Sequence, residues 1–168
     1  MPFEVRSEQA GDVSGIHGVN ASAFSTPAEA NLVDSLRNAG GMALSLVAEN
    51  REGIVGHLLL SLVSVDGINT PSAGLGPVAV LPAFQRRGIG SALVRSALAA
   101  CPSLGIQSVF VLGHPEYYPR FGFIPASRFS LRFTAEVPDA AFLAVEIVPG
   151  CLAKASGLVR FRPEFDGV

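Results

Sequence analysis

The feature that most constrains the fold is a succession of a strand, a hinge and a helix between residues 73 and 100. Residues 73–80 are mostly apolar, and from Gly88 to Ala100 the apolar side chains recur with a period of 3.6 residues. After Pro102, which ends the helix, residues 107–113 form a short apolar run typical of a strand buried on both faces. The pattern predicts a βαβ unit, whose two strands are parallel.

Two helices and a hairpin are expected before this unit. Residues 13–24 have helical spacing, and a second helix is expected to start at Pro27, with Thr26 as its cap. The apolar runs at residues 42–49 and 54–65 flank turn residues and predict two antiparallel strands. The expected fold class is therefore α/β, in a single domain with a mixed sheet.

Composition excludes several classes of protein. The net charge is −2 and the eleven arginines are scattered along the 168 residues, so nucleic acid is not an expected partner. No apolar run approaches the ~20 residues of a membrane span, and the first residues lack the apolar core of a signal peptide. The protein is expected to be cytoplasmic, without a membrane partner. Cys101 and Cys151 have no metal-ligand spacing, so no metal site is expected.

The hinge, Gln85-Arg86-Arg87-Gly88-Ile89-Gly90, has the composition of an anion site. The N–H groups at the start of a helix have no partner within the helix, and the helix dipole adds to their attraction for an anion. Glycine at positions 88 and 90 keeps side-chain atoms away from a ligand, and the forked guanidinium groups suit a phosphate. The hinge is predicted to hold a pyrophosphate.

Three nucleotide-binding motifs use such a hinge, and their spacing separates them. A P-loop needs lysine directly after its last glycine, but the only lysine here is Lys154. A Rossmann fingerprint needs a third glycine, where Leu93 stands, and an acidic residue after the next strand, which ends without one. The pattern Gln/Arg-x-x-Gly-x-Gly/Ala does match, from Gln85 to Gly90.

With this motif the sequence resembles the GCN5-related N-acetyltransferase (GNAT) superfamily, and within it the bacterial group of predicted acetyltransferases typified by YhbS. Residues 27–37 (PAEANLVDSLR) and 111–123 (VLGHPEYYPRFGF) agree with that group in order and spacing. The resemblance implies a mixed, mostly antiparallel, twisted sheet that is splayed between its fourth and fifth strands and flanked by helices. It assigns residues 1–150 to the acetyltransferase domain and residues 151–168 to a strand or arm that completes it.

The resemblance also implies acetyl-CoA as the cosubstrate. The acetyl group would pass directly, within a ternary complex, to a primary amine of a small molecule or peptide. Backbone groups of the fourth strand would bind the thioester and pantetheine, and the hinge would bind the pyrophosphate. The residues concerned are Val78, Ala79, Val80, Gln85, Arg86, Arg87, Gly88, Ile89, Gly90 and Ser91.

Tyr118 is the expected general acid. It begins the family's Tyr-x-x-x-Gly-Phe pattern, which Gly122 and Phe123 complete. A phenol with a pKa of about 10 stays protonated at neutral pH and can protonate a departing thiolate. The alternatives are that Tyr117 has this role, or that the tyrosines are core aromatics beside Phe121.

The general base is less defined. Many relatives carry a glutamate on the fourth strand, but residues 73–80 contain no carboxylate. His114 and Glu116 are the candidates, although His114 could simply shape a turn; His57 is a weaker one, since it lies within a strand. A water-mediated route, or an acceptor that binds already neutral, needs none of them. Transfer through Cys101 is not expected, because a helix C-terminus disfavours a thiolate.

Two alternatives stay open. Because the fourth-strand glutamate is missing, the chain could be a non-catalytic acyl-CoA-binding sensor instead of an enzyme. In residues 151–168, Val159 and Phe161 alternate with arginines, as in an edge strand or arm. That segment would either cover the edge of the sheet or contact a second subunit in a homodimer.

Overall fold

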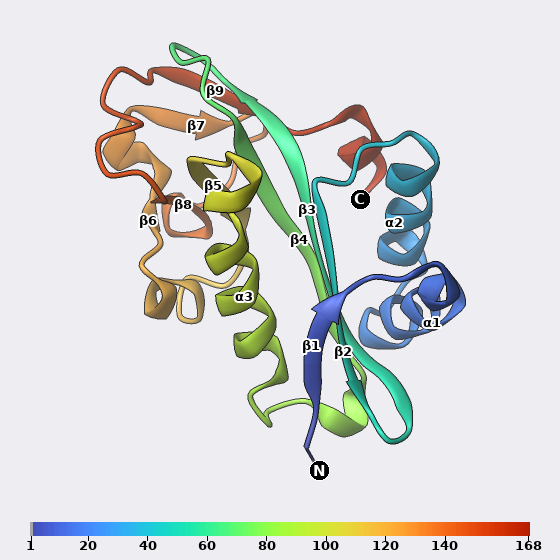
Figure 1. Cartoon of the computed structure of the whole chain (residues 1–168). Coiled ribbons are helices and arrows are strands. Elements are labelled where there is room, and N and C mark those ends of the chain that lie inside the picture. Colours follow the sequence, from blue (N-terminus) through green and yellow to red (C-terminus); the bar gives the residue numbers. More distant parts are fainter. Residues whose placement is uncertain (1) are drawn as a thin grey trace. The chain divides into compact units, whose positions relative to one another are not determined.

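The structure, a computed structural model, describes residues 2–168 and contains three α-helices and nine strands in the part of the chain that it describes (Figure 1). Short 3-10 turns connect several of them. The helices are α1 (Val13–Ala23), α2 (Ala28–Asn38) and α3 (Ile89–Ala100). The strands are β1 (Glu4–Ser7), β2 (Leu44–Asn50), β3 (Gly53–Val65), β4 (Ser72–Val80), β5 (Ser108–Leu112), β6 (Ile124–Pro125), β7 (Leu131–Phe133), β8 (Phe142–Glu146) and β9 (Gly157–Arg160).

The sheet is mixed and mostly antiparallel, as expected. Its strands are ordered β1-β2-β3-β4-β5-β8-β6, and β9 pairs with both β3 and β7 outside this path. The pairs β1–β2, β2–β3, β3–β9, β5–β8 and β6–β8 are antiparallel, whereas β4–β5 and β7–β9 are parallel. The parallel β4–β5 pair confirms the predicted βαβ unit around α3.

The predicted splay between β4 and β5 is present in their register. Only Ser72, Ala73 and Gly74 of β4 pair with β5, although β4 continues to Val80. Two residues later Gly76 adopts a φ of +138°, which favours glycine, and Pro77 has no N–H to donate. The second half of β4 is therefore not paired with β5.

The chain divides into two compact units, each with its own apolar core. The first takes in the chain up to Leu60, together with Gly76–Ala97 and Pro163–Val168, and the second takes in Ser61–Leu75 and Leu98–Arg162. The core of the first unit packs α1 and α2 against β2 and β3, through Ile16, Leu32, Val33, Leu36, Val47 and Leu59. The core of the second unit includes Phe110, Leu131, Phe142, Leu152 and Val159.

The C-terminal segment is part of these cores. Val159 of β9 is fully buried, whereas its neighbour Arg160 is exposed, in agreement with the alternation seen in the sequence. Because β9 pairs with β3 on one side and β7 on the other, it covers an edge of β3. Of the two roles proposed for residues 151–168, covering the sheet edge is the one that the structure shows; contact with a second subunit stays a prediction.

The start of α2 lies one residue later than predicted. The carbonyl of Pro27 accepts the first helical bond, from the Asn31 N–H at 3.0 Å, so Pro27 is the cap and Ala28 is the first helical residue. Thr26 still contributes, since its Oγ1 accepts the Ala28 N–H at 3.4 Å. The sequence pattern placed the cap wrongly because proline is more common at the first helical position than at the cap.

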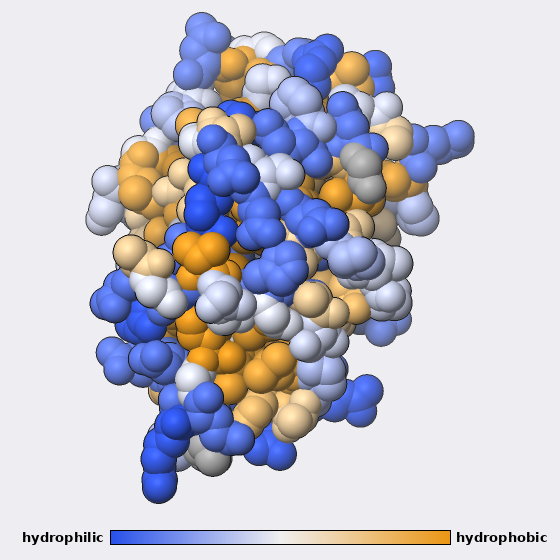
Figure 2. Space-filling model, turned by 90° about the vertical axis from the view of Figure 1, so that its right-hand side faces the viewer, coloured by the Kyte–Doolittle hydropathy of each residue, from blue (hydrophilic) through white to orange (hydrophobic). Residues whose placement is uncertain are grey.

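Part of the apolar excess lies on the surface. Figure 2 shows the side on which Figure 1 draws α1 and α2, and hydrophobic residues gather there in the lower half of the view, bordered by hydrophilic ones. Within α1 itself Val13 is 39% exposed. Contiguous apolar surface on a folded domain commonly marks a binding face. Among residues 2–168, none of the helices could span a membrane.

Gly56 on β3 should tolerate no larger residue. A Cβ atom there would lie 2.9 Å from Ile89 Cγ2, 3.1 Å from Leu93 Cδ1 and 3.2 Å from Ala48 Cβ. Gly56→Ala is therefore expected to lower the free energy of unfolding by about 1–3 kcal/mol through overpacking. Gly18→Ala, on α1 where a Cβ atom meets nothing within 4 Å, should instead raise it by about 0.5–1 kcal/mol. Urea unfolding of both variants would show the opposite signs, and equal effects would contradict this packing.

Candidate active site

The loop between β4 and α3 is built to present backbone N–H groups. The Gly88 carbonyl accepts the first helical bond, from the Ala92 N–H at 3.0 Å, so α3 starts directly after Gly88. The N–H groups of Ile89 and Gly90 precede the first residue that can bond within the helix. This end of α3 also carries the positive end of the helix dipole, so it attracts an anion.

The backbone of this loop bends sharply at two residues. Arg86 has a φ of +63° and Gly88 a φ of +85°. The left-handed region is uncommon for a residue with a side chain, and such residues concentrate at functional loops. A Cβ atom at Gly88 would meet nothing within 4 Å, so the space above the loop is open. The predicted anion site therefore has room for a ligand.

Side chains hold the loop to the end of β4. Gln85 Nε2 donates to the Val80 carbonyl at 3.0 Å, and the guanidinium of Arg87 lies 5.5 Å from the centre of the Phe84 ring. Arg86 and Arg87 are both exposed. Gln85 thus joins the loop to the end of β4, and the two positive charges of Arg86 and Arg87 lie on the surface of this loop.

The backbone of β4 offers its free edge at Val78 and Val80. The Leu81 N–H donates to the Val55 carbonyl of β3 at 2.9 Å, so residue 81, and with it Ala79 two residues before, directs its backbone groups toward β3. The alternate residues Val78 and Val80 then direct theirs to the opposite edge. Pairing with β5 ends at Gly74, before either of them.

Tyr118 begins the turn that follows β5 and lies in the second unit. Its side chain is buried, 8% exposed, between the rings of Tyr117 and Phe123, whose centres lie 5.1 Å and 5.7 Å away. Among the described residues its hydroxyl has no hydrogen-bond partner. Burial, with a smaller effect from Tyr117, raises the pKa of Tyr118 to about 12. The phenol therefore holds its proton across the neutral and moderately alkaline range.

The candidate bases His114 and Glu116 lie just before Tyr118 and are exposed. The His114 carbonyl accepts the N–H groups of Tyr117 at 3.1 Å and Tyr118 at 3.4 Å, so its backbone starts the turn. No side-chain hydrogen bond of His114 or Glu116 is found within residues 2–168. Both side chains are free to meet a ligand from solvent.

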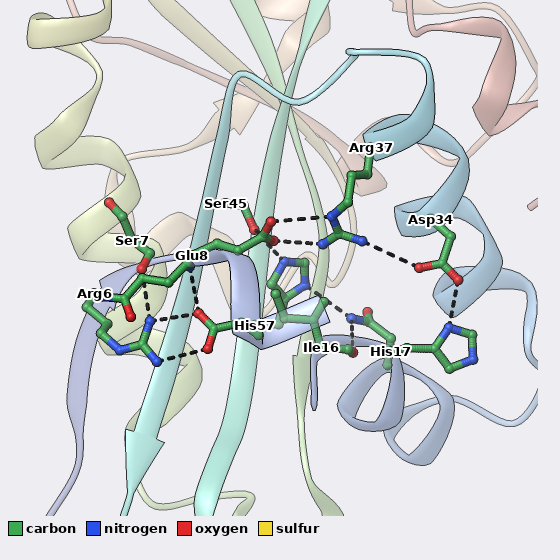
Figure 3. Close-up of polar contacts among 12 residues, drawn as sticks. Arg6, Ser7, Glu8, Ile16, His17, Asp34, Arg37, Ser45 and His57 are labelled. Carbon is green, nitrogen blue, oxygen red and sulfur yellow. Dashed lines mark hydrogen bonds and ion pairs between the residues drawn. The ribbon is translucent and has the colours of Figure 1, made fainter. Parts of the chain in front are cut away.

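His57 belongs to a buried chain of hydrogen bonds in the first unit (Figure 3). Its Nδ1 lies 3.1 Å from Asn20 Nδ2, and its Nε2 lies 2.9 Å from Ser45 Oγ. The Ser45 hydroxyl donates to Glu8 at 2.7 Å, and Arg37 donates to the same Glu8 oxygen at 2.7 Å. The sequence did not indicate this chain, because its members come from five separate elements or loops.

This series of hydrogen bonds fixes which ring nitrogen of His57 carries the proton. The Asn20 amide is a donor, so Nδ1 accepts and Nε2 carries the proton that it donates to Ser45. Burial, with a smaller effect from Arg37, lowers the pKa of His57 to about 4, against the opposing charge of Glu8. Burial also raises the pKa of Glu8, but its bonds from Arg37 and Ser45 bring it below the ordinary value. His57 is thus a neutral sheet residue whose ring nitrogens are both engaged.

Comparison with known proteins covers the whole candidate site. Residues 43–125 match the model of the family described as acetyltransferase (GNAT) domain. The chain is 32% identical over 163 residues to the uncharacterized N-acetyltransferase YhbS of Escherichia coli K12, covering 96% of this chain and 98% of the relative. It is 40% identical over 120 residues to the uncharacterized N-acetyltransferase YjhQ of the same strain, covering 69% of this chain and 66% of the relative.

Solved structures show the same fold. The crystal structure of YhbS from Escherichia coli in complex with CoA superposes with a TM-score of 0.93 at 32% identity, over 98% of this chain and 92% of that one. A GNAT family acetyltransferase from Brucella melitensis in complex with acetyl-CoA gives a TM-score of 0.82 at 33% identity, over 98% and 99%. Both similarities extend through the C-terminal segment.

The buried histidine should make stability depend on pH. An unfolded chain binds a proton at His57 below about pH 6.5, whereas the folded chain does so only below about 4. The contribution of His57 to the free energy of unfolding is therefore fully present above pH 6.5 and is lost as the pH drops toward 4. The loss is roughly 3 kcal/mol if each pKa unit contributes about 1.4 kcal/mol.

Urea unfolding between pH 7 and pH 4 would measure this slope. His57→Gln should flatten it whatever its effect on stability at pH 7, whereas His114→Gln, at an exposed position, should leave it unchanged. An unchanged slope in His57→Gln would contradict the assignment.

Proposed function

Because this chain belongs to the GNAT acetyltransferase family, we propose that it transfers the acetyl group of acetyl-CoA to a primary amine of a small molecule or peptide, directly within a ternary complex. Acetyl-CoA supplies an activated acetyl group as a thioester. The chain must then bind the cosubstrate, take up the charge that develops on the acetyl oxygen, and exchange protons with amine and thiol.

The observation that carries the proposal is the start of α3. A pyrophosphate needs several N–H donors and positive charge in an open, fixed loop. The first turn of α3 provides the N–H groups, Arg86 and Arg87 the charge, and Gly88 the open space. YhbS and the Brucella melitensis acetyltransferase, both similar along nearly the whole chain, were crystallised with CoA and acetyl-CoA. The residues present thus fit the cosubstrate.

The free edge of β4 supports the rest of the binding site. Val78 and Val80 direct N–H and C=O groups away from β3, at a position where β5 no longer pairs. Pantetheine contains two amides, and strand edges recognise amides through main-chain hydrogen bonds. The Val80 carbonyl is already held by Gln85, so Gln85 acts by fixing this edge as well as by its place in the motif.

Tyr118 fits the role of general acid. It carries its proton at neutral pH, as a phenol of ordinary pKa also would, and a neutral phenol can protonate a thiolate as it departs. The raised pKa makes Tyr118 a weaker acid than an ordinary phenol, so the role rests on its place in the family motif. For the base, His114 and Glu116 stay the candidates; β4 has no carboxylate. An acceptor that loses its proton to water needs neither.

The arginines of the loop should bind the pyrophosphate and not the pantetheine. Arg86→Ala and Arg87→Ala are each expected to weaken CoA binding roughly tenfold, at the lower end of the contribution of about 1.5–3 kcal/mol for hydrogen bonds to charged groups, because both side chains are exposed. Binding of pantetheine, which lacks the pyrophosphate, should not change. Arg51→Ala, in the exposed turn between β2 and β3, is the matched control. Calorimetry with both ligands tests this, and equal losses for CoA and pantetheine would argue against the assignment.

Tyr118→Phe separates an enzyme from a sensor. As an enzyme, the variant should lose roughly 100-fold in kcat, the lower end of the range for general acid catalysis, while its affinity for CoA stays unchanged. The wild-type rate should show no fall from ionisation of Tyr118 below pH 10, because its pKa lies near 12. Thiol release with a panel of amines measures both. A wild-type chain that binds acetyl-CoA but releases no thiol with any amine would support the non-catalytic sensor.

A further inference from the structure

The ring of Tyr118 lies against the backbone of Gly113, the residue that directly follows β5. A Cβ atom at position 113 would lie 2.5 Å from Cε2, 3.1 Å from Cδ2 and 3.5 Å from Cζ of that ring. Real Cβ atoms essentially never come this close to another heavy atom, so a side chain at this position would displace the ring or the backbone. The ring excludes a side chain here, and the backbone conformation does not, because the φ of Gly113 is not positive.

The backbone of Gly113 is held to the neighbouring strand. Its N–H donates to the Ala141 carbonyl at 2.9 Å, and Ala141 directly precedes β8. One residue earlier, Leu112 of β5 is paired with Phe142 of β8. An added side chain at position 113 would therefore act on the Tyr118 ring more readily than on the paired backbone.

The remaining contacts of Tyr118 enclose its ring and leave its hydroxyl accessible. The rings of Tyr117 and Phe123 meet it nearly at right angles, at 81° and 76°. The Tyr118 hydroxyl has no partner within residues 2–168, yet it is not one of the fully enclosed side-chain oxygens that lack a partner. The hydroxyl therefore reaches the surface although the residue is buried, as a group that gives its proton to a ligand requires.

We propose that Gly113 is a positioning residue for Tyr118: its lack of a side chain gives the ring its place at the end of β5 and so holds the hydroxyl where it donates its proton. The transfer breaks the O–H bond of Tyr118 and forms the S–H bond of CoA, and the proton that the amine loses returns to the phenolate through water. The acceptor of this proton rests on the proposed acetyl transfer, whereas the placement of the ring does not.

Fluorescence tests the placement of the ring without turnover. Tyr117 and Tyr118 are the only tyrosines and the chain has no tryptophan, so Tyr117→Phe leaves Tyr118 as the single emitter. Adding Gly113→Ala to this variant should increase quenching by acrylamide, because the displaced ring becomes accessible, while far-ultraviolet circular dichroism stays unchanged. Equal quenching with and without Gly113→Ala would overturn the proposal.

Gly74→Ala is the matched control for this measurement. A Cβ atom there would also clash with an aromatic ring, that of Phe161, and both residues lie in the same compact unit as Gly113. The substitution therefore imposes a similar packing defect away from Tyr118. It should leave the quenching of Tyr118 unchanged, and an increase equal to that of Gly113→Ala would show a general loosening and contradict the specific role.

Turnover separates positioning from a loss of stability. Gly113→Ala should lower kcat by up to roughly 100-fold, as a misplacement of about 1 Å can, and leave the KM for acetyl-CoA unchanged. The measurement is thiol release with acetyl-CoA and the most active amine of the panel. In a Tyr118→Phe background the same substitution should have almost no further effect on kcat, because residues that act as a unit are not additive. Additive losses would count against the proposal.

Failure of the proposed function gives a different result. If the wild type releases no thiol, or if Tyr118→Phe keeps the full kcat, the acid role is wrong, and the quenching of the Gly113 variant still decides whether this glycine places the ring. Should Gly113→Ala not fold, its combination with Phe123→Leu, which frees space beside the same ring, is the variant for both measurements.

Discussion

The short pairing of β4 with β5 is the constraint on which the candidate site depends. A strand that paired with neighbours along its whole length would use every backbone N–H and C=O group in hydrogen bonds to them. Here Gly76 and Pro77 follow the last paired residue, and the next residues, up to Val80, keep one edge free of β5. The C-terminal end of this open segment is held by two hydrogen bonds, from Leu81 to β3 and from Gln85 to Val80. The free edge and the anion loop are therefore consecutive parts of the chain, joined where these two bonds are made.

Buried polar groups give the first unit a specific arrangement in addition to its apolar core. His57, Ser45 and Glu8 form one directional chain, and Arg37 and Asn20 close its two ends. Each side chain provides the hydrogen-bond partner that the next one needs. This series of hydrogen bonds is therefore compatible with only one register of β2 against β3 and one orientation of α1. Within this series of hydrogen bonds, Asn20 Oδ1 has no partner among the described residues, although Asn20 is fully buried.

Local sequence patterns were sufficient to predict the elements whose structure depends on residues close together in the sequence. The period of residues 88–100 and the glycines of the hinge predicted α3 and its open start, and the alternation at Val159 predicted a half-buried strand. Pattern failed where partners are distant in sequence. Nothing near His57 in the sequence indicates that Asn20 and Glu8 belong to the same series of hydrogen bonds. The cap of α2 was missed because the roles of Thr26 and Pro27 differ by a single hydrogen bond.

The late segment of the chain contributes to two separate cores. Val159 is a member of the second core, and six residues later Phe165 packs against the first, beside Ile16 and Leu36. During translation neither core can be completed until the ribosome has delivered this stretch and released it from the exit tunnel. Part of the apolar surface of both units therefore stays uncovered until residues 159–165 have left the ribosome, and the two cores are completed by the same late step of synthesis.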